Sequence, residues 1–120
     1  MYYIVCTHFA RSPRKISEVR ALMQFVWDLK KARRNEEKHG VSFELARLVF
    51  DDPFVVSVPD DYEIEQRWRT LGLVKGILIL VVVHTLEDRE DEEIIRIISA
   101  RKATPHERKG YEDRRPESRR

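Results

Sequence analysis

One apolar run limits the folds open to this chain more than any other feature of its sequence. It spans residues 77–85, is rich in β-branched side chains, and follows the turn dipeptide Lys75-Gly76. The run is too short and too branched for a stable helix, since β-branched side chains lose rotamer freedom there. It also falls far short of the roughly 20 residues that a membrane-spanning helix needs. We therefore predict a central strand, buried on both faces, and no membrane segment.

Alternation of apolar and polar residues on both sides of this run predicts further strands. Short turns join most of them, so an antiparallel meander is expected. A turn at Pro59-Asp60-Asp61 separates two of the strands, and an acidic loop at residues 86–92 precedes the last one. The strands are predicted at residues 2–5, 24–27, 54–58, 68–74, 77–85 and 93–100.

Local capping signals predict three helices. Asp28 and Gly40 bracket the first, which covers the intervening residues. Ser42 caps a second helix at residues 43–50, which ends before Pro53 because a residue preceding proline disfavours the helical region. A capping box at residues 104–107 begins a third helix that runs to about Tyr111. Together these elements predict an α+β fold, with a small antiparallel sheet flanked by about three helices.

The two ends of the chain differ from its middle. Residues 1–22 carry four basic and one acidic side chain, and residues 101–120 carry eight and four, whereas the stretch between them is net acidic. Residues 1–22 are either an ordinary first strand and helix or an N-terminal extension, disordered or a start-site artefact, with Met23 as the natural start. Residues 23–112 form the organised domain. Residues 113–120 form a basic tail that we expect to be disordered, because it has too little apolar content to pack.

Composition also bounds the setting and the chemistry. The chain has 120 residues and a net charge of only +2, so an anionic partner must be met by a local patch and not by the average field. The lone cysteine, Cys6, fits a cytoplasmic protein, and no secretory signal is evident. The four histidines are scattered without zinc-ligand spacing, so we expect neither a metal nor another cofactor.

Three segments of the chain resemble one known family. They are WDLKKARRNEEKHGVSFELARLVFDDP at 27–53, RWRTLGLVKGILILVVVHT at 67–85 and IRIISARKATPHERKGYE at 95–112. These segments are similar to toxins of the BrnT type, and the resemblance spans residues 24–112. It does not extend over residues 1–22.

The resemblance implies a function and a partner. Toxins of the BrnT type belong to type II toxin–antitoxin pairs, have a RelE-like fold, and are ribonucleases that stop translation. The resemblance further implies a ribbon-helix-helix antitoxin, which neutralises the toxin and binds operator DNA to repress the shared operon. On this basis we expect a metal-independent endoribonuclease that takes RNA as its substrate.

A ribonuclease that uses no metal needs particular side chains. A base must take the proton of the 2′-hydroxyl, cations must stabilise the charge on the phosphate, and an acid must protonate the leaving oxygen. Histidine suits proton transfer near neutral pH, and the guanidinium of arginine matches two phosphate oxygens. The candidate catalytic residues are Arg67, Arg96, Arg101, His39 and His84, and the candidate substrate-binding residues are Lys38, Arg69, Glu107 and Tyr111.

Each candidate also has a purely structural interpretation. Lys38 and His39 could complement the C-terminal end of a helix, and His84 could be a hydrogen-bonded packing residue. Arg96 could form an ion pair on the sheet, Glu107 could cap its own helix, and Tyr111 could stack on a base or pack on the sheet. Two alternative functions stay open as well. One is a catalytically inactive homologue that only binds its antitoxin and regulates the operon, and the other is a general nucleic-acid-binding domain.

Overall fold

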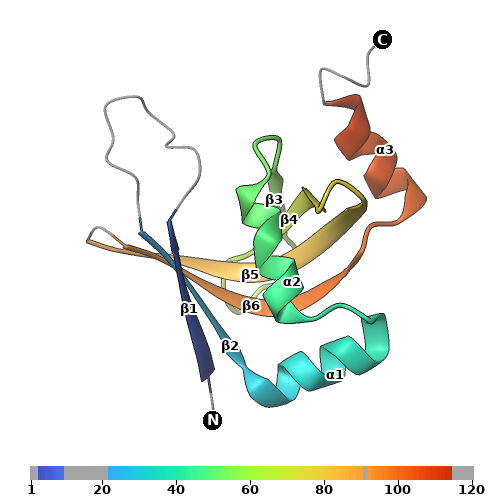
Figure 1. The fold of residues 1–120 in the computed structure, drawn as a ribbon. Helices are drawn as coiled ribbons and strands as arrows, with labels where there is room; N and C mark the ends of the chain where they lie inside the picture. Colours follow the sequence, from blue (N-terminus) through green and yellow to red (C-terminus); the bar gives the residue numbers. More distant parts are fainter. Residues whose placement is uncertain (1–2, 10–21, 91, 115–120) are drawn as a thin grey trace.

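A computed structural model describes residues 3–9, 22–90 and 92–114 of the chain. Figure 1 shows a twisted sheet with helices packed against it. No helix in these residues is long and apolar enough to cross a membrane. The strands are β1 (Tyr3–Phe9), β2 (Leu22–Asp28), β3 (Val56–Asp60), β4 (Arg67–Val74), β5 (Leu78–Arg89) and β6 (Glu92–Lys102). The helices are α1 (Leu29–His39), α2 (Phe43–Ala46), the 3₁₀ helix η1 (Arg47–Asp51) and α3 (Pro105–Asp113).

The described strands form one mixed sheet in the order β1-β2-β6-β5-β4-β3. Strands β3 to β6 make the predicted antiparallel meander, and the α+β class is confirmed. A purely antiparallel sheet is wrong, because β2 lies parallel to β6, with Phe25 opposite Ile95. The helices that follow β2 carry the chain away from it, so β2 pairs with a strand that is far along the sequence. The likeness to the RelE fold stays a prediction.

The predicted acidic loop at residues 86–92 is wrong. Strand β5 continues through Glu87 to Arg89, and β6 begins at Glu92, so most of these residues pair across a hairpin. Glu87 and Arg89 form an ion pair along the strand, and Glu90 takes the left-handed conformation of a tight turn (φ 49°). Charged residues on an exposed hairpin show no apolar alternation, which is why the sequence pattern concealed the strands.

The predicted turn at residues 59–61 begins too early. Pro59 and Asp60 are the last residues of β3 and pair with Trp68 and Arg67. Strand β3 lies at the edge of the sheet, where a proline is tolerated because its missing N–H can face away from the neighbouring strand. The turn at Lys75-Gly76 is confirmed, and both residues have the positive φ that a two-residue hairpin turn requires.

The core lies between the sheet and the segment from α1 to η1. The aromatic rings of Trp27 and Phe43 meet edge to face, with centroids 6.0 Å apart. The predicted central strand is buried on both faces over residues 79–82, whereas Ile77 is exposed in the turn before β5. The fully buried core side chains that β2, β5 and β6 contribute are Phe25, Trp27, Leu80, Val82, Ile95, Ile97 and Ala100.

The caps predicted for the three helices are present at Asp28, Ser42 and Thr104. The Asp28 carboxylate accepts hydrogen bonds from the backbone at the start of α1, and Gly40 ends that helix in the left-handed conformation. The second predicted helix is divided, because α2 ends at Ala46 and the chain continues as η1. This tighter helix lies on β4 at Gly72, where a Cβ atom would come within 2.7 Å of Val49 Cγ1.

Helix α1 is attached to the sheet by one buried amide. Asn35 donates hydrogen bonds to the carbonyl oxygens of Val41 and Ala100, and its Oδ1 accepts one from the Ala100 N–H. Strand β2 pairs with β6 only as far as Arg96, so this part of β6 has a free edge. The amide satisfies backbone groups that would otherwise be buried without a partner.

The N-terminal and C-terminal segments are described only in part. The short strand predicted at residues 2–5 corresponds to β1, which pairs antiparallel with β2. The helix that is one interpretation of residues 1–22 would lie mostly outside the described residues, as does the tail from residue 115 onwards. The assignment of residues 1–22 to an extension stays a prediction.

Candidate active site

Four arginines project from the same face of the sheet, opposite the face that packs on α1 and α2. We call this set, Arg67, Arg69, Arg96 and Arg101, the arginine face. In β4, Arg67 and Arg69 alternate with side chains that face the helices, as the two-residue spacing predicts. In β6, Arg96 lies between the buried core residues Ile95 and Ile97 and therefore points away from the helices.

A β-bulge brings Arg101 to the same face as Arg96. Five residues separate the two positions, and strict alternation would place their side chains on opposite faces. The register between β5 and β6 shifts at Val83/His84, so Arg96 opposes Thr85 while Arg101 opposes Val81. Because Val81 and Thr85 are four residues apart on a regular strand, they share a face, and so do the two arginines. Bulges commonly redirect side chains in this way beside functional sites.

Glu65 joins two of the arginines. Its carboxylate accepts hydrogen bonds from Arg96 at 2.8 and 3.0 Å and from Arg67 Nε at 3.0 Å. The pKa of Glu65 is lowered, mainly by the hydrogen bond from Arg67. Burial has a smaller effect and acts in the opposite direction. The carboxylate is therefore ionised at neutral pH. Guanidinium groups from two strands thus converge on one anionic group.

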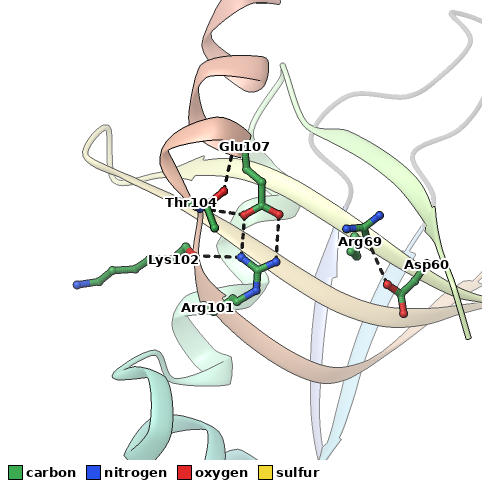
Figure 2. A network of polar contacts seen from close by, with 6 residues as sticks. All are labelled: Asp60, Arg69, Arg101, Lys102, Thr104 and Glu107. Carbon is green, nitrogen blue, oxygen red and sulfur yellow. Dashed lines mark hydrogen bonds and ion pairs between the residues drawn. The ribbon is translucent and has the colours of Figure 1, made fainter.

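Arg101 is paired with a carboxylate from α3. Figure 2 shows two parallel contacts, from Arg101 Nη1 to Glu107 Oε1 at 2.7 Å and from Nη2 to Oε2 at 3.0 Å. Glu107 also forms the predicted capping box with Thr104. The hydrogen bond from Arg101 lowers the pKa of Glu107 to about 2, and the same bond raises the pKa of Arg101. The capping role of Glu107 is thus confirmed, while its contact with substrate stays a prediction.

Arg69 has a weaker partner. Its Nε forms an ion pair with Asp60 Oδ1 at 3.2 Å (Figure 2). The geometry of this contact is not that of a hydrogen bond, and Nε is buried without a hydrogen-bond acceptor among the described residues. All four members of the arginine face are therefore paired with carboxylates. Three different segments supply these carboxylates: the end of β3, the connection between β3 and β4, and α3.

The structure separates His84 from the arginine face. His84 alternates with the arginine-facing Val83 and Thr85, so its ring points toward the helices, 5.0 Å from the ring of Phe50. Its Nδ1 lies 3.1 Å from the Thr85 carbonyl oxygen and its Nε2 lies 2.6 Å from Thr70 Oγ1. Since a carbonyl can only accept, Nδ1 carries the proton and Nε2 accepts from Thr70.

Burial fixes the charge state of this histidine. Only 3% of His84 is exposed, and this burial lowers its pKa to about 4. The ring is therefore neutral at pH 7. The packing interpretation of His84 accounts for these contacts, and nothing in its placement supports the catalytic one.

The remaining predicted residues do not gather at the arginine face either. Lys38 and His39 lie in the last turn of α1, on the opposite side of the sheet from the arginine face. Tyr111 is buried, and its hydroxyl donates a hydrogen bond to Asp52, which also accepts one from the Leu73 N–H. Of the two interpretations of Tyr111, packing is the one that this environment supports.

The residues that organise the arginine face are not among the candidates predicted from the sequence. Asp60 ends β3, and Tyr62 and Glu65 lie in the connection to β4, where the sequence pattern predicts only a turn at residues 59–61. Their signal was weak, since each is one of many charged or polar residues in an irregular segment. No group of three His, Cys, Asp or Glu side chains in the described part of the chain is arranged to hold a metal ion.

Comparisons with known proteins address the identity of the chain. A search of curated proteins gives no match. Among solved structures, the chain is similar to the 1.1 Å crystal structure of the Brucella abortus ribonuclease toxin BrnT, with 22% identity and a TM-score of 0.45 over 65% of this chain and 92% of that chain. The family model of BrnT, the ribonuclease toxin of type II toxin–antitoxin systems, matches residues 27–107. Since this match covers more than half of the sequence, the chain belongs to the BrnT family of ribonuclease toxins.

Proposed function

We propose that this protein is an endoribonuclease toxin that binds and cleaves RNA at the arginine face. The observation that carries the proposal is the carboxylate of Glu65 between Arg67 and Arg96. Two guanidinium groups thus donate hydrogen bonds to one anionic group, and arginine binds phosphate oxygens with the same donors. Family membership supports RNA cleavage as the reaction. The convergence of these side chains supports the arginine face as the place where RNA binds.

The same side chains can carry the chemistry without a metal. In the proposed step, Glu65 accepts the proton of a ribose 2′-hydroxyl as the 2′-oxygen attacks the adjacent phosphorus. The bond from phosphorus to the 5′-oxygen breaks as that oxygen takes a proton from water, which leaves a 2′,3′-cyclic phosphate on one product and a 5′-hydroxyl on the other. Glu65 then returns its proton to the solvent. Arg67 and Arg96 stabilise the charge on the phosphorane, an electrostatic role that accounts for a large share of catalysis in such sites.

The lowered pKa of Glu65 is compatible with this role. The hydrogen bond from Arg67 holds the free carboxylate in its ionised form, which is the form that accepts a proton. When a phosphate takes over the guanidinium contacts, Glu65 loses its partners and becomes more basic beside the bound anion. In this scheme Arg101 binds a neighbouring phosphate after releasing Glu107, and His84 maintains the core beneath the site.

A cleavage assay tests the proposal. Purified protein, treated with a chelator to remove metal ions, should cleave single-stranded RNA and leave 2′,3′-cyclic phosphate ends. Arg96→Ala should lose about a hundredfold or more in rate, as is typical when a charge-stabilising group is removed. Arg89→Ala is the matched control, because Arg89 is also an ion-paired arginine on a strand but lies on the outer hairpin. Equal rates for the two variants, both shown to be folded, would refute the site.

A second function is favoured by one feature of the arginine face. Every arginine in it is already paired with a carboxylate, as expected of a catalytically inactive homologue that only binds its antitoxin and regulates the operon. Induced expression separates the two. The toxin should arrest growth and degrade RNA, whereas the inactive homologue should bind its antitoxin without either effect.

The partner and the cellular role are part of the same proposal. We expect RNA cleavage in the cytoplasm to inhibit translation, and a ribbon-helix-helix antitoxin to neutralise the toxin and bind operator DNA on behalf of the complex. Co-expression with the product of the neighbouring gene should yield a stable complex that restores growth. A gel-shift assay with the operator should show binding by the complex and none by the toxin alone.

The boundaries of the working domain are proposed at residues 23–112. The family match to residues 27–107 supports them, and residues 1–22 are then an extension that adds β1 to the sheet beside β2. Mass spectrometry of the protein purified from its own host would test this assignment, since a chain beginning at Met23 lacks the mass of the first 22 residues.

A further inference from the structure

The connection between β3 and β4 presents an aromatic ring beside the arginine face. Tyr62 lies in this connection and is 38% exposed, so its ring is outside the main core. The guanidinium of Arg67 lies over the ring, with its Cζ atom 3.6 Å from the ring centroid. A cation at this distance is attracted to the π-face of a tyrosine. The ring is therefore held at the surface by a specific contact.

Two further contacts hold this ring next to the proposed phosphate site. The Tyr62 N–H donates a 2.9 Å hydrogen bond to the Asp60 carbonyl oxygen, which ties the start of the connection to the end of β3. The same Arg67 that covers the ring also binds the Glu65 carboxylate. One guanidinium group thus separates Tyr62 from the position that the scissile phosphate takes in the proposed function.

We propose that Tyr62 is a stacking platform for a base of single-stranded RNA, next to the phosphate held by Arg67 and Arg96. This inference rests on the proposed function and assigns it a base-binding residue. Proteins that bind single strands combine cations for the backbone with aromatic rings for the bases. Each nucleotide carries a base and a phosphate on the same sugar. A strand that places a phosphate on Arg67 therefore brings an adjacent base within reach of the Tyr62 ring.

The chemistry favours an unpaired base. Bases within a duplex are already stacked on their neighbours and hydrogen-bonded, whereas an unpaired base is free to stack on a protein ring. Stacking on a tyrosine does not depend on the hydrogen-bonding groups of the base. All bases can stack in this way, because every base has a π-face. The platform would therefore select single strands over duplexes, with little selection for sequence.

An abasic scan of the ligand tests the proposal. The probe is a short single-stranded RNA with 2′-O-methyl riboses, which block cleavage, and with one base removed at each position in turn. Against the unmodified protein, one position should weaken binding about tenfold, within the range measured for the loss of one base–aromatic stack. Tyr62→Ala should weaken binding of the intact probe by a similar factor and should show no further loss at that position.

Control variants make the result specific to the ring. Tyr62→Phe should keep both the affinity and the position-dependent loss, because it retains the π-face. Ile64→Ala changes an even more exposed side chain of the same connection, 84% exposed, and should behave like the unmodified protein. If Tyr62→Ala lowers the stability of the fold, Tyr62→Leu serves in its place, since it keeps apolar bulk without an aromatic ring.

The outcomes separate this inference from the proposed function. A Tyr62→Ala protein that keeps the same position-dependent loss would overturn the stacking role alone, as would an unmodified protein that cleaves RNA but is insensitive to abasic sites. An unmodified protein that neither binds nor cleaves RNA would overturn the proposed function and this inference with it.

Discussion

Acid should destabilise this protein through His84. The histidine is buried and neutral in the folded chain, where its pKa is about 4, against a reference value of 6.5 for the exposed group. As the pH falls below 6.5, the unfolded chain gains a proton that the folded chain cannot yet accept. The stability present above pH 6.5 is therefore lost progressively, and the loss is complete when the pH has fallen through 4.

The magnitude follows from the two pKa values. Between pH 7 and pH 5 the free energy of unfolding should fall by about 2 kcal/mol from this residue. Carboxylates contribute little in this interval, because the pKa values of Glu65 and Glu107 are lowered and their stabilisation is lost only at lower pH. Urea titrations across the interval measure the effect directly.

Two variants test whether His84 causes the slope of the free energy of unfolding against pH. His84→Gln should be less stable at pH 7 but should lose most of the pH dependence between pH 7 and pH 5. His106→Gln is the matched control, because His106 is exposed on α3 and its removal should leave the slope unchanged. An unmodified protein with constant stability down to pH 5, or a His84→Gln variant with the full slope, would refute the account of a buried neutral imidazole.

Other expected outcomes concern stability and helix capping. Asn35→Ala should lower the free energy of unfolding by roughly 2–4 kcal/mol, since it leaves the buried N–H and carbonyl of Ala100 unpaired; a loss below 1 kcal/mol in urea titrations would contradict this. Gly72→Ala should cost about 1–3 kcal/mol, because the added methyl group meets Val49, and an unchanged melting temperature would refute that contact. Glu107→Ala should remove the capping box and fray α3, with faster amide hydrogen exchange confined to that helix; unchanged exchange there would argue against the cap.

The local features of the fold could be predicted from the sequence because their signals lie within a few residues. Asp28 and Gly40 bound α1 as expected, and the capping box of α3 forms between Thr104 and Glu107. Each of these depends on hydrogen bonds between groups that are at most four positions apart in the sequence. The spacing of two between Arg67 and Arg69 was equally informative, because alternation on a strand is a local rule.

The organisation of the site depends on contacts that no local pattern encodes. The parallel pairing of β2 with β6 joins segments about 70 residues apart, and the bond from Arg96 to Glu65 spans 31 positions. The bulge opposite Val83/His84 is a single extra residue, and it decides which face Arg101 occupies. His84 alternates with the buried Leu80 and Val82, so the local pattern favours its packing interpretation.

The most direct test of the proposed site is a crystal structure of the protein with an uncleavable single-stranded RNA. The proposal predicts a phosphate within hydrogen-bonding distance of both Arg67 and Arg96, with the Glu65 carboxylate displaced from its bridging position and close to the 2′-oxygen. An RNA bound elsewhere on the protein, with Glu65 still bridging the two arginines at 2.8–3.0 Å as it does here, would contradict it.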